Sequence, residues 1–127
     1  MILSDTDCVI DFLKNRAPEN GKVRRALIAR ELCVSAVTAF ELYFGDPVGR
    51  GRSRLDQLFE SIVVLPVTQR TAWIGAEQGT RLAGIGLTLA MPDLLIAAAA
   101  LETGVPIVTR NVRHFSRIEG LEILEPG

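Results

Sequence analysis

The sequence predicts an α/β fold, a three-layer α/β/α sandwich with a mainly parallel central sheet. Short apolar segments alternate with longer helical segments along the whole chain, and this alternation is typical of strands that pair in parallel across helical connections. The chain has 127 residues, of which 48% are hydrophobic, so it can bury one sizeable core and is short for two. We therefore expect a single domain over residues 1–127.

The expected elements follow from apolar periodicity and from capping residues. Asp7, Ser35 and Thr68 are suitable helix N-caps, Pro92 suits a first helical turn, and Gly104 suits a helix end. The expected helix from Pro92 to Thr103 is apolar almost all round, which is typical of an element packed inside a fold. The expected helices are 8–13, 23–29, 36–44, 53–61, 69–83 and 92–103, and the expected strands are 1–4, 32–34, 62–65, 106–108 and 121–124.

Composition excludes several classes of protein. The mean hydropathy of +0.27 excludes a disordered chain. Two cysteines without CxxC spacing and a single histidine argue against a disulfide framework or a zinc site, so we expect Cys8 and Cys33 to be small core residues. With a formal net charge of -1, any contact with nucleic acid has to come from local arginine clusters.

No membrane attachment is expected from the sequence. The start of the chain is acidic and has no basic leader, unlike a signal peptide. The most apolar stretch, 87–101, is interrupted by Pro92 and Asp93 and is shorter than the ~18 clean residues of a membrane span. We expect a cytoplasmic protein.

Three acidic residues have positions that suggest chemistry. Asp5 directly follows the first expected strand, and Asp93 opens the apolar helix. Glu41 lies among apolar helical neighbours, with no Lys or Arg three or four positions away. Two carboxylates about 4 Å apart repel by roughly 4 kcal/mol at an effective dielectric of about 20, and a hard divalent cation relieves that repulsion. Because Mg²⁺ prefers a few carboxylates plus retained waters, the three acids predict a magnesium site.

Each acid also has a purely structural interpretation. Asp5 and Asp7 both suit helix N-caps. Asp93 suits the positive end of a helix dipole, and the Glu41 side chain can reach solvent along an exposed edge. Three further acids are expected to be solvated or capping residues, namely Asp11, Asp46 and Asp56.

Three segments together resemble the PIN-domain nucleases, especially the VapC-type toxins of toxin-antitoxin pairs. MILSDTDCVIDFL is similar to the family's opening of an apolar strand followed by Asp-Thr-Asn, with Asp7 in place of the commoner Asn. SAVTAFELYFG has a Ser before a helix and a Glu six residues on. MPDLLIAAAALETGVPIVTRNVRHF resembles the family's block of Asp, helix, Gly, strand and Thr. Such short motifs carry weight through their order and spacing, and they extend over essentially the whole chain.

The resemblance implies an endoribonuclease in which Mg²⁺, or Mn²⁺ in its place, activates water to cleave RNA. It assigns catalysis to Asp5, Glu41 and Asp93 and the metal to Asp5 and Asp93. Around them it places a secondary set of Asp7, Thr109 and Asn111. It also implies a homodimer held inactive by a cognate antitoxin protein.

One departure from the family pattern concerns the metal. Many relatives have a fourth acid two residues after the Thr, where this chain has Asn111. We therefore expect one bound metal in the resting state. In the turn that follows, Phe115 is expected in the core and His114 is not expected to act in catalysis. Three arginines of the GRGRSR run are suitable for phosphates or an acidic antitoxin segment, although a solvated loop explains them equally well: Arg50, Arg52 and Arg54.

Two other functions remain open at this point. A degenerate PIN domain would act as a non-catalytic RNA- or protein-binding module, and Asn111 favours that alternative. The segment LSDTDCV also resembles the Asp-x-Asp opening of haloacid-dehalogenase-like phosphatases, with Asp5 as nucleophile and Asp7 as acid/base. That family needs a later lysine, whereas the only lysines are Lys14 and Lys22.

Overall fold

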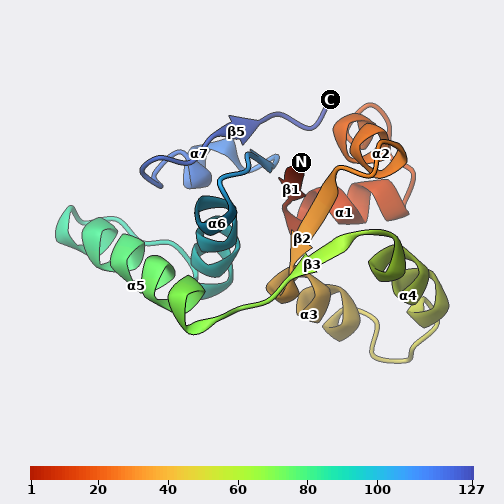
Figure 1. Ribbon diagram of the computed structural model, residues 1–127, viewed down its shortest axis with the longest axis horizontal. Coiled ribbons are helices and arrows are strands. Elements are labelled where there is room, and N and C mark those ends of the chain that lie inside the picture. The colour runs from red at the N-terminus through yellow and green to blue at the C-terminus, as the bar shows by residue number, and fades with distance from the viewer.

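A five-stranded parallel sheet forms the centre of the computed structural model, which describes residues 1–127 (Figure 1). The strands are β1 (Ile2–Ser4), β2 (Leu32–Ser35), β3 (Val63–Leu65), β4 (Ile107–Val108) and β5 (Ile123–Leu124). Their order is β3-β2-β1-β4-β5, and every neighbouring pair is parallel. The predicted α/β/α class with a mainly parallel sheet is confirmed.

Seven helices connect and cover the strands, and six of them correspond to the expected ones within a few residues. The helices are α1 (Thr6–Leu13), α2 (Gly21–Ile28), α3 (Ala36–Phe44), α4 (Arg52–Ser61), α5 (Gln69–Gly84), α6 (Met91–Thr103) and α7 (Val112–Phe115). The short helix α7 was expected only as a turn, because four residues are too few for a periodic pattern. No helix is long and apolar enough to cross a bilayer.

The side chains of β2 show how the sheet is enclosed on both faces. Leu32 and Val34 pack against α1 to α4, whereas Cys33 points to the opposite face, with α5 and α6. Figure 1 shows the same separation, with α5, α6 and α7 on one side of the strands and α1 to α4 on the other. Both cysteines are buried free thiols, as predicted for core residues. Strands buried on both faces explain why the apolar runs are continuous and not alternating.

Helix α6 is packed inside the fold and carries Asp93 in its first turn. Its residues from Ile96 to Ala100 are all buried, and Gly75 and Gly79 of α5 let α5 approach its Leu94 closely. The helix ends at Gly104, whose φ of 71° is the left-handed conformation that glycine adopts readily. Because α6 is fixed by this packing, Asp93 in its first turn is held in a defined place.

Candidate active site

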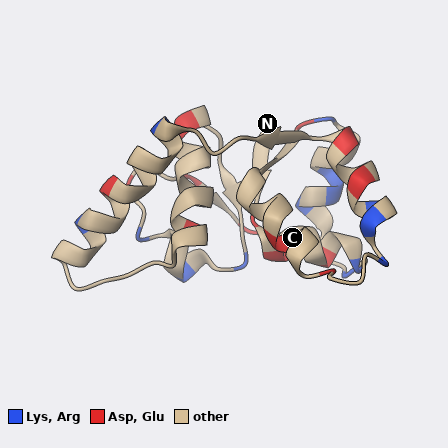
Figure 2. Cartoon of the chain, turned by 90° about the horizontal axis from the view of Figure 1, so that it is seen from below, with Lys and Arg blue, Asp and Glu red and all other residues tan.

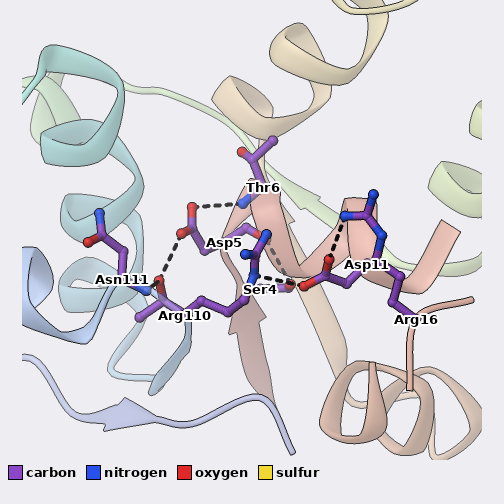
Figure 3. Close-up of polar contacts among 8 residues, drawn as sticks. Ser4, Asp5, Thr6, Asp11, Arg16, Arg110 and Asn111 are labelled. Carbon is purple, nitrogen blue, oxygen red and sulfur yellow. Dashed lines mark hydrogen bonds and ion pairs between the residues drawn. The ribbon is translucent and has the colours of Figure 1, made fainter. Parts of the chain in front are cut away.

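The candidate site lies where β1 and β4 end side by side. Ser4 and Val108 are partners in the parallel register, so Asp5 and Thr109, the next residues, leave the sheet together. The backbone amide of Asp5 donates to the Val108 carbonyl at 2.9 Å. Thr109 Oγ1 donates to Asp5 Oδ2 at 2.8 Å, and Figure 3 shows the surroundings of the Asp5 carboxylate. The carboxyl end of a parallel sheet is the usual place for function in this fold class.

Asp5 is held through both of its carboxylate oxygens. Oδ1 accepts a hydrogen bond from the Thr6 amide at 2.7 Å, which makes Asp5 the N-cap of α1. The expectation that Asp7 caps this helix is therefore wrong, because the chain turns helical one residue after β1 and leaves Asp7 exposed in the first turn. The two hydrogen bonds fix the orientation of the Asp5 carboxylate.

Burial disfavours the charged form of Asp5. The residue is 5% exposed, and burial raises its pKa from 3.8 to about 6. The hydrogen bonds from Thr109 and Thr6 oppose this rise, whereas the negative charges of Asp7 and Asp93 add to it. Asp5 is thus an acid whose ionised form is stabilised by hydrogen bonds and lacks a compensating cation.

Asp93 approaches the same region from the first turn of α6. It is half-buried, and burial raises its pKa above the usual range. The charges of Glu41 and Asp7 raise the pKa further, while His114 lowers it. The negative charge of Asp93 acts on Asp5, and that of Glu41 acts on Asp93, so Asp93 lies within electrostatic reach of both other acids.

Glu41 is oriented by two threonines that sequence analysis did not single out. Thr6 Oγ1 donates to Glu41 Oε1 at 2.7 Å and lies 2.9 Å from Thr38 Oγ1. Thr38 precedes Glu41 by three residues on α3, a spacing that places both on one helix face. That spacing was the one available sequence signal, and it is weak without knowing that α1 packs against this face.

None of the acids at the site is neutralised by a basic side chain. The ion pairs of the protein join other residues, and Asp5, Asp7, Glu41 and Asp93 take part in none of them. No three acidic, histidine or cysteine side chains converge as a ready-made metal centre. The available metal ligands are thus single carboxylates carried by different helices and strand ends. This donor set fits Mg²⁺, which is usually bound through one or two carboxylates and keeps several waters.

The remaining predicted residues divide into two groups. The backbone amide of Asn111 donates to Thr109 Oγ1 at 2.9 Å, so Asn111 is joined to the site by its contact with Thr109. Of the three arginines of the GRGRSR run, Arg50 precedes α4, whereas Arg52 and Arg54 lie in its first turn. None of them makes a hydrogen bond or ion pair with the site acids. Basic residues are spread over both halves of the molecule (Figure 2).

Comparison with known proteins identifies the family. The sequence pattern of the PIN domain matches residues 2–121. The chain belongs to the PIN-domain family. It is 30% identical to the tRNA(fMet)-specific endonuclease VapC of Salmonella typhimurium over 94% of this chain and 92% of the relative. It is also 30% identical to ribonuclease VapC19 of Mycobacterium tuberculosis, over 96% and 98% of the two chains.

A solved structure gives the same assignment. The DNA-bound VapBC structure of Salmonella typhimurium contains a chain that is 25% identical, superposes with a TM-score of 0.85, and is covered over 98% of its length by 99% of this PIN domain. The predicted resemblance to VapC-type PIN domains is confirmed, and the alternative resemblance to phosphatases is set aside.

One acid of this PIN domain is not where the sequence suggested. Asp11 was expected to be solvated or capping, but it is 2% exposed and forms ion pairs with Arg16 and Arg110. Arg110 follows β4 and is remote from Asp11 in the sequence, so no local sequence pattern predicts the contact. Of the other two acids, Asp46 accepts from the Gly51 amide and Asp56 pairs with Arg52 at the surface, as capping or solvated residues do.

The raised pKa of Asp5 predicts how stability depends on pH in metal-free protein. Because the folded-state pKa of about 6 exceeds 3.8, the folded state binds the proton more tightly, and stability falls as pH rises through this window. At pH 8 the effect on the unfolding free energy is roughly 3 kcal/mol. Asp5→Asn should therefore melt at a higher temperature than the wild type at pH 8 with chelator present, and at a similar temperature near pH 3.5. A variant less stable at pH 8 would contradict the burial argument.

Proposed function

We propose that this chain is a Mg²⁺-dependent endoribonuclease and the toxin component of a VapBC-type toxin-antitoxin pair. The observation that carries the proposal is the buried Asp5 carboxylate, with a pKa raised to about 6 and the charge of Asp93 acting on it. Buried acids with strongly perturbed pKa values are enriched at active sites. The VapC relatives are named endonuclease and ribonuclease, which supports RNA as the substrate.

Asp5 and Asp93 would hold the metal ion, with Mn²⁺ able to replace Mg²⁺. Their carboxylates lack basic partners, so a hard divalent cation matches both the charge and the donor type. When bound, the ion supplies a stronger water nucleophile and neutralises charge that develops on the phosphodiester. Asn111 contributes no charge where many relatives have an acid, which supports one resting metal.

The chain's own residues would position the reacting groups. Thr109 and the Thr6 amide hold the Asp5 carboxylate in one orientation. Thr6 also fixes Glu41 through its hydroxyl, so the remaining Glu41 oxygen is available to orient a water molecule or accept its proton. Asp7 is exposed beside the site and adds negative charge without a fixed contact.

The arginines near α4 are better suited to the antitoxin than to RNA. Arg54 lines a hollow of about 240 Å³ together with three leucines, one further basic residue and one acid, namely Leu13, Leu42, Leu55, Lys14 and Asp46. Apolar side chains beside two basic ones are complementary to a peptide segment that carries apolar and acidic side chains. We therefore assign Arg50, Arg52 and Arg54 to contact with a cognate antitoxin, in keeping with the VapBC structures that this fold resembles.

An aromatic pair on α3 supports a homodimer. The rings of Phe40 and Phe44 are stacked with centroids 5.6 Å apart, and the residues are 64% and 75% exposed. Large aromatic side chains are enriched in the buried cores of interfaces. A second copy of the chain would remove both rings from water.

The nuclease proposal predicts that single neutralised acids lose activity without unfolding. Asp5→Asn and Asp93→Asn should each lower cleavage of a structured RNA by at least about a hundredfold, because each removes a charged metal ligand. Glu60→Gln, an exposed acid on α4, is the control and should cleave like the wild type. Rates are compared in Mg²⁺, in Mn²⁺ and in chelator.

The same series distinguishes the alternative of a non-catalytic module. The wild type should melt at a higher temperature in millimolar Mg²⁺ through binding linkage, and the two Asn variants should not. RNA binding without cleavage by the wild type, together with no effect of metal on melting, would favour a degenerate PIN domain and reject the proposed site.

The dimer proposal predicts that one charge on α3 separates the subunits. Phe44→Glu should sediment as a monomer at concentrations where the wild type is a dimer, because a carboxylate in an apolar interface is strongly disfavoured. Phe44→Leu keeps an apolar side chain and should remain largely dimeric. A wild type that is monomeric at all accessible concentrations would refute the assignment of this surface.

A further inference from the structure

The turn that follows β4 is attached to the segment from β1 into α1 at two consecutive residues. Thr109 donates its hydroxyl hydrogen bond to Asp5, and Arg110 Nε lies 2.8 Å from Asp11 Oδ2 (Figure 3). The first contact reaches the site itself. The second lies further along α1, and the site described above does not explain it.

Asp11 is a buried carboxylate on α1 that takes no part in the candidate site. It is 2% exposed, and its Oδ1 accepts from Arg16 Nη1 at 3.2 Å, whereas Oδ2 has no hydrogen-bond partner and faces only the Arg110 guanidinium. Both arginines are about half exposed, at 50% and 46%. A buried carboxylate that loses a cationic partner is strongly disfavoured, so Asp11 holds Arg110 in place.

Fixing Arg110 also fixes its neighbours. Thr109 Oγ1 accepts from the Asn111 amide at 2.9 Å and therefore directs its own hydrogen towards Asp5. The arrangement needs the backbone of the turn in one conformation. The Arg110 side chain, running across to α1 in Figure 3, supplies that restraint from outside the site.

We propose that Asp11 and Arg110 form a positioning pair, which holds Thr109 against Asp5 and so keeps the Asp5 carboxylate in its reactive orientation. The inference rests on the proposed nuclease function. Neither residue of the pair touches the reacting atoms. Loss of the pair lets the turn move, and small displacements at a reacting centre reduce rates sharply.

The two arginines on Asp11 provide a matched comparison. Arg110→Gln and Arg16→Gln each remove one cation from the same buried carboxylate, but only Arg110 is in the turn that carries Thr109. Arg110→Gln and Asp11→Asn should lower kcat for RNA cleavage by about ten- to a hundredfold with KM little changed. Arg16→Gln should keep the wild-type kcat, and the Asp11→Asn/Arg110→Gln double variant should be no slower than either single variant.

Metal affinity supplies a measurement that does not depend on turnover. Calorimetric titration with Mn²⁺ should show weaker binding to Arg110→Gln and Asp11→Asn than to Arg16→Gln, at a temperature where all variants are folded. Arg110→Lys keeps a charge opposite Asp11 and should recover most of the lost kcat. It also serves as the folded test variant if Asp11→Asn does not fold.

Two results would overturn the positioning role while leaving the nuclease function intact. In the first, Arg110→Gln raises KM with kcat unchanged and Asp11→Asn behaves like the wild type, so Arg110 binds RNA directly. In the second, Arg110→Gln and Asp11→Asn keep wild-type kcat and Mn²⁺ affinity, as Arg16→Gln does, so the ion pairs serve stability alone. A wild type that neither binds Mn²⁺ nor cleaves RNA would overturn the proposed function and this inference together.

Discussion

The placement of one carboxylate, Asp5, connects the fold of this protein to the chemistry proposed for it. The parallel register of β1 and β4 brings Asp5 and Thr109 together at the end of the sheet. The abrupt change from strand to helix makes Asp5 the cap of α1. The same carboxylate therefore closes a helix, accepts a hydrogen bond from the neighbouring strand and remains buried without a cation. Everything else at the site is arranged around that position.

Such an arrangement opposes stability, and the proposed metal site accounts for it. Burial and the nearby charge of Asp93 favour the protonated form of Asp5, and its two hydrogen bonds only partly offset them. The protein elsewhere pairs its buried acid Asp11 with two arginines, so it can supply cations where charge compensation alone is needed. No basic side chain pairs with Asp5, which leaves room for an external cation. Natural proteins commonly retain such local destabilisation at functional sites.

Much of the fold was predictable from sequence because its signals are local. Apolar runs gave the strands, and Ser35, Thr68 and Gly104 capped helices as expected. Asp5 and Asp93 were predicted as site residues for a related reason, because each stands at a junction between an apolar segment and its neighbour. The cap of α1 was misplaced by two residues, because Asp5 and Asp7 are equally good capping residues and only the backbone distinguishes them.

The contacts that orient the site were not predictable, since they join residues distant in sequence. Thr6 meets Glu41 only when α1 packs on α3, and Arg110 meets Asp11 only when β4 lies beside β1. A threonine next to an aspartate, or an arginine in a turn, has no distinctive pattern of its own. The sequence therefore indicated the candidate acids of the site, whereas the structure was needed to find the side chains that orient these acids.

Anomalous diffraction from crystals grown with Mn²⁺ can locate the proposed metal ion. If Asp5 and Asp93 hold it, an anomalous peak lies in ligand contact with both carboxylates, and no such peak is present in Asp5→Asn crystals grown in the same way. A peak held by other residues, or an empty acidic site at saturating Mn²⁺, would contradict the proposed metal site.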